Sequence, residues 1–150
     1  MALDDDIGIL AGVGIFEEFT QEQLRLLAFG TERLRLVAGK EIYREGAAAD
    51  SAFVVVSGRV SLVRDKDGER VRLASMGPGS LLGELALIAQ SRRPTAAVTE
   101  TDCQLMRLNR NLFRRILEEY PEVAVLLHKR LSAEFADMAA RIEGVSHKFS

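Results

Sequence analysis

The sequence predicts a mainly β domain flanked by helices (an α+β class), with a sandwich or jelly-roll barrel at its centre. Residues 31–108 contain several short runs of strand-forming residues, which turn residues separate at close, regular spacing. Residues 1–30 and 109–147 instead place apolar residues at helical spacing. A chain of 150 residues, 47% of them hydrophobic, suits one domain with a sizeable core. We therefore expect a single domain over residues 1–150.

The N-terminal segment predicts a short helix with a clear start and stop. Thr20 followed by Gln23 is a capping-box pattern, and Gly30 supplies a stop signal. Three apolar residues between them share one face of the helix: Leu24, Leu27 and Ala28.

The central segment alternates between strand patterns and turns. The run ERLRLVAGK alternates apolar and charged residues before a glycine turn, and the β-branched run SAFVVVSGRVSLV is also broken by a glycine. Asp67-Gly68 predicts a hairpin turn, after which Val71 and Leu73 alternate with arginines. This alternation predicts a hairpin with one wet face. The run TAAVTETDCQLMRL supplies two more strand candidates around a polar turn.

The C-terminal segment returns to helical spacing. Asn109 is a candidate cap for one helix, and Pro121 fits the first position of the next. The second helix carries an apolar stripe at intervals of three or four residues: Ala124, Leu127, Leu131, Phe135, Met138, Ile142 and Val145. Such a stripe packs on the barrel, on a second copy of the chain, or on both, so we expect a homodimer as one use of it.

Composition and charge exclude several classes of function. The net charge of −2 gives no basic field for nucleic acid, and the apolar runs are far shorter than the roughly 18 residues of a membrane span. The start MALDDDIGIL is acidic where a signal peptide is basic, and Cys103 has no second cysteine to pair with, so we expect a cytoplasmic location. His128 and His147 are too few for a histidine metal cluster. We find no nucleophile–base constellation and expect neither a metal nor an enzyme.

The stretch GPGSLLGELALIAQSRRPTAAV, residues 77–98, predicts a ligand site. GELALIA is a turn that runs into a short helical piece, whose first backbone N–H groups attract an anion, and Gly83 lets a ligand approach the backbone. Glu84 repels a bare phosphate but accepts a hydrogen bond from a sugar hydroxyl. Arg93 or Arg92, about ten residues further on, can close over the phosphate with charge-assisted hydrogen bonds. Together these groups describe a site for a ribose phosphate.

GELALIAQSRRPTAA resembles the phosphate-binding cassette of cyclic-nucleotide-binding domains. The resemblance extends to GIFEEFTQEQLRLLA, to AGKEIYREGAAADSAFVVVSGRVSLV and to LNRNLFRRILEEYPEVAVLLHKRL, and so covers about residues 13–140. It implies an eight-stranded β-roll with flanking helices that binds cAMP or cGMP. It further implies a non-enzymatic sensor in which the ligand repositions the C-terminal lid helices. The DNA-binding part of some family members does not follow, so we expect no direct DNA binding.

The resemblance also assigns roles to individual residues. It implies that Glu84 binds the ribose 2′-hydroxyl, that Arg93 binds the cyclic phosphate, and that backbone amides of the cassette assist. It places apolar residues against the base, two from the strands and one from the lid helix. The amides belong to Gly83, Leu85 and Ala86, and the base wall comprises Leu62, Leu73 and Met138.

Pro94 departs from the family pattern. The family places Ser, Ala or Thr after the arginine, and Pro94 lacks the backbone N–H that such a residue donates. The lost charge-assisted bond is worth about 1.5–3 kcal/mol, or roughly ten- to a hundred-fold in affinity. An alignment moved by one residue gives that position to Thr95 and leaves Arg93 to reach from next door. The alternative function is an interaction module that keeps the fold without binding a nucleotide.

Overall fold

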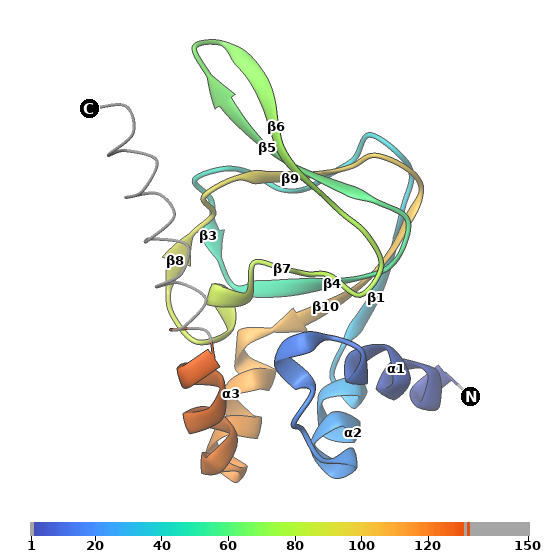
Figure 1. Ribbon diagram of the computed structural model, residues 1–150, viewed down its shortest axis with the longest axis vertical. Coiled ribbons are helices and arrows are strands. Elements are labelled where there is room, and N and C mark those ends of the chain that lie inside the picture. The colour runs from blue at the N-terminus through green and yellow to red at the C-terminus, as the bar shows by residue number, and fades with distance from the viewer. Residues whose placement is uncertain (1, 131, 133–150) are drawn as a thin grey trace.

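The computed structural model describes residues 2–130 and 132, and its fold is the predicted β-sandwich with flanking helices (Figure 1). Two four-stranded antiparallel sheets make up the sandwich. The first has the order β1 (Glu32–Leu36), β10 (Cys103–Asn109), β4 (Ser51–Ser57) and β7 (Leu81–Leu82). The second has the order β2 (Glu41–Tyr43), β9 (Ala96–Thr99), β5 (Val60–Lys66) and β6 (Glu69–Met76). A separate short pair joins β3 (Ala48–Ala49) to β8 (Ser91–Arg92).

Strand β4 of the first sheet is buried on both faces, which explains its unbroken apolar run. Ala52 and Val54 pack into a cluster with the helices, whereas Phe53 and Val55 pack into the core between the two sheets. All four side chains are no more than 5% exposed. A strand with two covered faces has no reason to alternate apolar and polar residues.

The helices cover the outer face of the first sheet (Figure 1). On the N-terminal side they are α1 (Ala2–Ala11), the 3₁₀ turn η1 (Gly14–Phe16) and α2 (Gln21–Phe29). The capping box at the start of α2 is confirmed: Gln23 N donates to the Thr20 hydroxyl at 3.2 Å, and Thr20 N donates to the Gln23 side chain at 2.9 Å. Phe16 of η1 lies 6.1 Å from Phe113 of α3 (Arg110–Glu119), measured between ring centroids, so the two groups of helices share one core.

The C-terminal helices begin where the sequence predicts. The side chain of Asn109 accepts a hydrogen bond from Asn111 N at 2.8 Å and caps α3, and a second helix runs over residues 121–130. Within that part, Leu127 of the predicted stripe is fully buried and Ala124 is half-buried. His128 is exposed. Five stripe residues and one histidine lie outside the described residues: Leu131, Phe135, Met138, Ile142, Val145 and His147.

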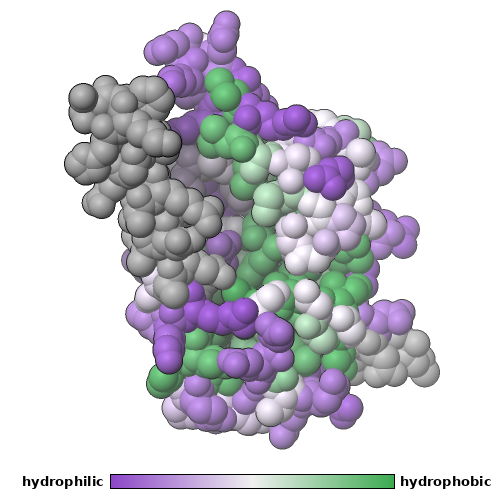
Figure 2. Space-filling view, in the orientation of Figure 1, coloured by the Kyte–Doolittle hydropathy of each residue, from purple (hydrophilic) through white to green (hydrophobic). Residues whose placement is uncertain are grey.

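The hairpin of β5 and β6 differs from the prediction that only one of its faces is exposed to solvent. Its turn at Asp67-Gly68 is confirmed, and both residues have the positive φ of a type I′ turn, 53° and 83°. However, Val71 and Leu73 are 39% and 56% exposed, because the outer part of the hairpin projects beyond the other strands of the second sheet (Figure 1). Figure 2 shows apolar side chains below its hydrophilic tip.

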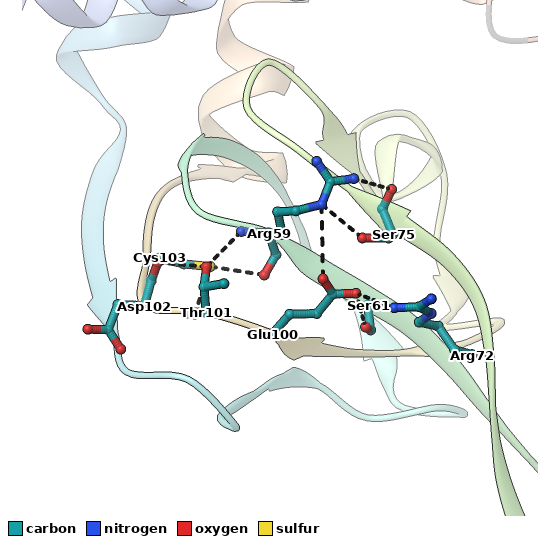
Figure 3. Close-up of polar contacts among 8 residues, drawn as sticks. All are labelled: Arg59, Ser61, Arg72, Ser75, Glu100, Thr101, Asp102 and Cys103. Carbon is teal, nitrogen blue, oxygen red and sulfur yellow. Dashed lines mark hydrogen bonds and ion pairs between the residues drawn. The ribbon is translucent and has the colours of Figure 1, made fainter.

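The turn between β9 and β10 is fixed by a polar network (Figure 3). The carboxylate of Glu100 accepts hydrogen bonds from the Ser61 hydroxyl at 2.5 Å and from Arg72 Nη1 at 3.1 Å. Hydrogen bonds from Ser61 and Ser75, with the charge of Arg72, lower the pKa of Glu100. The Cys103 thiol is buried in the same region and donates to backbone carbonyls at 3.3 Å, a structural position for this lone cysteine.

Candidate functional site

The predicted cassette folds as a glycine-initiated turn. Gly83 has φ +71°, the left-handed conformation that favours glycine, and the 3₁₀ turn η2 (Glu84–Leu87) follows directly. Ala86 and Leu87 are buried and anchor η2, whereas Leu85 is 40% exposed. Ala86 N donates to the Gly83 carbonyl at 3.0 Å, so this amide already serves the turn. The prediction of a turn running into a short helical piece is confirmed.

Arg93 directly follows β8, returns to the same turn and is buried, with 4% of the residue exposed. Its backbone is pinned on both sides: its N–H donates to the Ala47 carbonyl and its carbonyl accepts from Gly46 N, each at 2.8 Å. Its side chain donates through Nη2 to the Ser51 carbonyl at 2.6 Å. Arg93 is therefore held at its backbone and at one corner of its guanidinium.

The guanidinium of Arg93 lies against Gly83. A Cβ atom added to Gly83 would collide with Arg93 Nη1, and the Ser51 carbonyl lies 3.7 Å from the same point. Among the described residues, Arg93 Nε and Nη1 are buried without a hydrogen-bond partner. A buried guanidinium with two unengaged nitrogens beside a bare glycine backbone fits an anionic ligand.

Burial and neighbouring charges act together on Arg93. Burial lowers the pKa of Arg93, the nearby Tyr43 and Asp50 raise it, and Arg107 and Arg110 lower it. Arginine stays protonated in proteins, so the cluster keeps its positive charge. Arg107 Nη2 pairs with Asp50 at 3.4 Å. Arg110, the first residue of α3, donates to the carbonyls of Ala86 in η2, at 2.7 Å, and of Ala49 in β3.

Arg92 and Arg93 lie in different surroundings. Arg92 is exposed and donates through Nη1 to the Gly46 carbonyl at 2.9 Å. Successive side chains of a strand point to opposite sides, so only one of the two faces the cassette. Pro94 follows as an exposed residue between β8 and β9.

Tyr43 lies at the centre of the site, although the sequence did not single it out. Its ring centroid is 4.2 Å from Arg93 Cζ. Burial raises the pKa of Tyr43, while the charge of Arg93 and a side-chain hydrogen bond with Thr95 lower it and the charge of Glu84 raises it. Thr95 therefore lies against the Tyr43 hydroxyl, and the charge of Glu84 acts on the same group. Neither Tyr43 nor Ser51 belongs to a local motif; each meets Arg93 only through the fold.

The predicted base-wall residues lie on paired strands. Leu62 of β5 pairs with Ala74 of β6 and packs against the core between the sheets. The register shifts directly after this pair, and Leu73 is 56% exposed. Met138 lies outside the described residues. Within the described part of the chain, no group of three or more His, Cys, Asp or Glu residues is arranged to hold a metal ion.

The architecture, with its glycine turn facing a buried arginine, is that of the cyclic-nucleotide-binding fold. Residues 33–120, more than half of the chain, match the family model described as "Cyclic nucleotide-binding domain". The chain therefore belongs to this family, as the resemblance in the sequence predicts.

Individual relatives agree with this assignment. The solved structure of a cyclic nucleotide-binding-like protein from Brucella abortus bv. 1 str. 9-941 is 55% identical, with a TM-score of 0.71 over 77% of this chain and 99% of that one. A structure of the regulatory domain of Toxoplasma gondii PKA with cAMP is 25% identical, with a TM-score of 0.72 over 76% of this chain and 44% of that one. Lysophospholipase nte1 of Aspergillus fumigatus is 28% identical over 114 residues, which are 75% of this chain but only 8% of that protein.

Proposed function

We propose that this domain binds cAMP or cGMP at η2 and Arg93 and acts as a non-enzymatic regulatory domain. The observation that carries the proposal is the buried Arg93 guanidinium, held against Gly83 with Nε and Nη1 unengaged among the described residues. Membership of the cyclic nucleotide-binding domain family supports the ligand class. The cAMP-bound relative supports cAMP as the first nucleotide to test.

The proposed roles follow from the surroundings of each residue. Arg93 holds the cyclic phosphate, and Gly83 leaves the space that its guanidinium needs. We assign the N–H of Leu85 to the same phosphate, because the first N–H groups of a helical turn attract an anion. Glu84 accepts a hydrogen bond from the ribose 2′-hydroxyl. The amide of Ala86 is hydrogen-bonded within the turn, so we do not assign it to the phosphate.

The remaining assignments concern a further contact to the phosphate and the apolar contacts to the base. Thr95 lies beside Tyr43, and we assign its hydroxyl to the phosphate in place of the N–H that Pro94 lacks. Leu62 and Leu73 of the β5–β6 hairpin form the apolar wall for the base, and Met138 is proposed from the sequence alone.

Binding is tested by calorimetry with cAMP and cGMP. We expect Arg93→Ala to weaken binding by at least about ten- to a hundred-fold, the worth of one charge-assisted hydrogen bond. Arg92→Ala is the matched control and should leave affinity unchanged, since its side chain bonds to Gly46 instead. Glu84→Gln should weaken binding of both nucleotides through the shared ribose. No heat and no thermal shift with either nucleotide at millimolar concentration would favour the interaction module that has lost its ligand.

The regulatory part of the proposal concerns the C-terminal helices. Arg110 joins η2 to the first turn of α3, so a ligand that moves η2 also acts on α3. A ligand shifts such an equilibrium only by its different affinity for the two states. We propose that the shift changes contacts with a partner or a second copy through the C-terminal stripe. Sedimentation of wild type and of Leu131→Asp, with and without nucleotide, tests this; a monomer throughout would contradict the homodimer.

We further propose that the domain has no catalytic activity of its own and works in the cytoplasm. The enzyme relative is matched over only 8% of its length, so its activity does not transfer to this chain. None of the described helices is long and apolar enough to cross a membrane. Fractionation of cells that express the native gene tests the location, and a membrane or periplasmic fraction would contradict it.

A further inference from the structure

Two aromatic rings, one from each sheet, face the Arg93 guanidinium. The ring centroid of Tyr43, at the end of β2, is 4.2 Å from Arg93 Cζ, and that of Phe53, in β4, is 5.9 Å away. The two centroids are 6.0 Å apart with an interplanar angle of 33°. The shorter distance is typical of a cation stacked on a ring face, an arrangement to which the planar guanidinium is well suited.

The polar contacts of Arg93 do not by themselves define the plane of its guanidinium. The bond from Nη2 to the Ser51 carbonyl fixes one corner of the group and leaves rotation about that bond. Gly83 limits the position of Nη1 from one side. A ring packed against the flat face of the guanidinium removes the remaining freedom while leaving its in-plane N–H groups available.

Pro94 makes the orientation of the Arg93 guanidinium more important for binding an anion. It offers no N–H to a phosphate, and it restricts Arg93 before it to an extended backbone. The Arg93 N–H is itself already donated to Ala47. Near Pro94 the segment therefore relies on side chains, and the direction of the Arg93 N–H groups decides how well an anion is held.

We propose that Tyr43 is a positioning residue, whose ring holds the Arg93 guanidinium in the plane where Nε and Nη1 point at a phosphate. This inference rests on the proposed function, because it names how the same site orients its cation. The ring carries the role, and the hydroxyl, which contacts Thr95, does not. Tyr43→Phe should therefore keep the site intact, whereas Tyr43→Leu should not.

The first test reads the geometry without any nucleotide. In an NMR spectrum of the full chain, the Arg93 Nε–Hε signal, identified by its loss in Arg93→Lys, should be shifted upfield by the Tyr43 ring. Tyr43→Phe should retain the shift and Tyr43→Leu should abolish it. Tyr120→Leu replaces the chain's other tyrosine and should leave the signal in place. An Arg93 signal without a ring shift in wild type would overturn the stacked arrangement.

The second test reads affinity. Tyr43→Leu should weaken cAMP and cGMP by the same factor, about 2- to 30-fold, because the phosphate is common to both. The loss should disappear in an Arg93→Lys background, where there is no guanidinium to orient. Melting curves show whether each variant is folded at the temperature of the titration.

The outcomes separate the two proposals. If wild type binds neither nucleotide, the proposed function fails and the phosphate role of Tyr43 fails with it. If wild type binds and Tyr43→Leu binds equally well, only the positioning role is overturned. If Tyr43→Phe loses as much affinity as Tyr43→Leu, the hydroxyl acts instead of the ring, which also overturns the proposal as stated.

Discussion

A single methyl group added at Gly83 should disable the proposed phosphate site while leaving the fold in place. Gly83 has φ +71°, and a Cβ there would collide with Arg93 Nη1. Nη1 is at the end of a side chain, so the guanidinium moves rather than the backbone. The displacement separates Nε and Nη1 from the position where they meet the phosphate.

The losses of folding stability and of nucleotide affinity distinguish backbone strain at a glycine from the collision of its new Cβ atom with Arg93. A side chain in the left-handed region costs about 1–2 kcal/mol of folding stability. Gly39 provides the matched control, because its φ is +83° and an added Cβ would have nothing within 4 Å. Gly39→Ala should therefore lose this amount, and Gly83→Ala at least as much, because the Arg93 guanidinium must also move. Only Gly83→Ala should also lose about ten- to a hundred-fold in nucleotide affinity, the worth of one charge-assisted hydrogen bond.

Two measurements suffice for this prediction. Urea denaturation gives the free energy of unfolding of each variant, and calorimetry gives the affinity for cAMP and cGMP at a temperature where all are folded. Equal affinities for Gly83→Ala and Gly39→Ala would refute the reasoning, because they would show that the position of Arg93 against Gly83 does not matter for binding.

Three further predictions concern the fold around the site. Thr20→Ala should lower the free energy of unfolding by about 1 kcal/mol in urea denaturation, since the capping box of α2 is lost. Two serine hydroxyls and a nearby arginine lower the pKa of Glu100 below its ordinary 4.5, so wild type should lose stability as the pH falls from that value through the lowered one. Glu100→Gln should lose less over the same range; parallel curves would contradict this. Arg110→Met should lower stability by about 1.5–3 kcal/mol, whereas Arg114→Met on the exposed side of α3 should change the melting temperature little.

Much of the fold follows from local signals in the sequence. The structure has its helix caps at Thr20 and Asn109 and its hairpin turn at Asp67-Gly68, as the sequence predicts. The cap side chains accept hydrogen bonds from the first turn of each helix, and both turn residues have positive φ angles. These features depend on residues a few positions apart, which a sequence displays directly. The exposure of Leu73 was not predictable in this way, because it depends on how far the hairpin extends past the other strands.

In the candidate site, too, the residues that are close in the sequence were predictable, and those that only the fold brings together were not. Gly83 and Glu84 are adjacent, and Arg93 follows ten residues later, so the cassette is visible as one motif. Tyr43 is fifty residues before Arg93, and no local pattern links the two. Their stacking exists only because β2 and the short β3–β8 pair are brought together by the sandwich. The hydrogen bond from Ala86 to Gly83 is likewise a property of the folded turn.

The buried guanidinium of Arg93 sets binding and stability against each other. A cation withdrawn from water, with two nitrogens that bond to none of the residues the structure describes, lowers the stability of the protein on its own. If the proposed phosphate lies there, the nucleotide supplies the missing countercharge. The bound nucleotide then stabilises the folded domain as a buried side chain of the protein would. The melting temperature of the domain would then depend on the concentration of the second messenger. Resistance to proteolysis in the cell would follow that concentration as well.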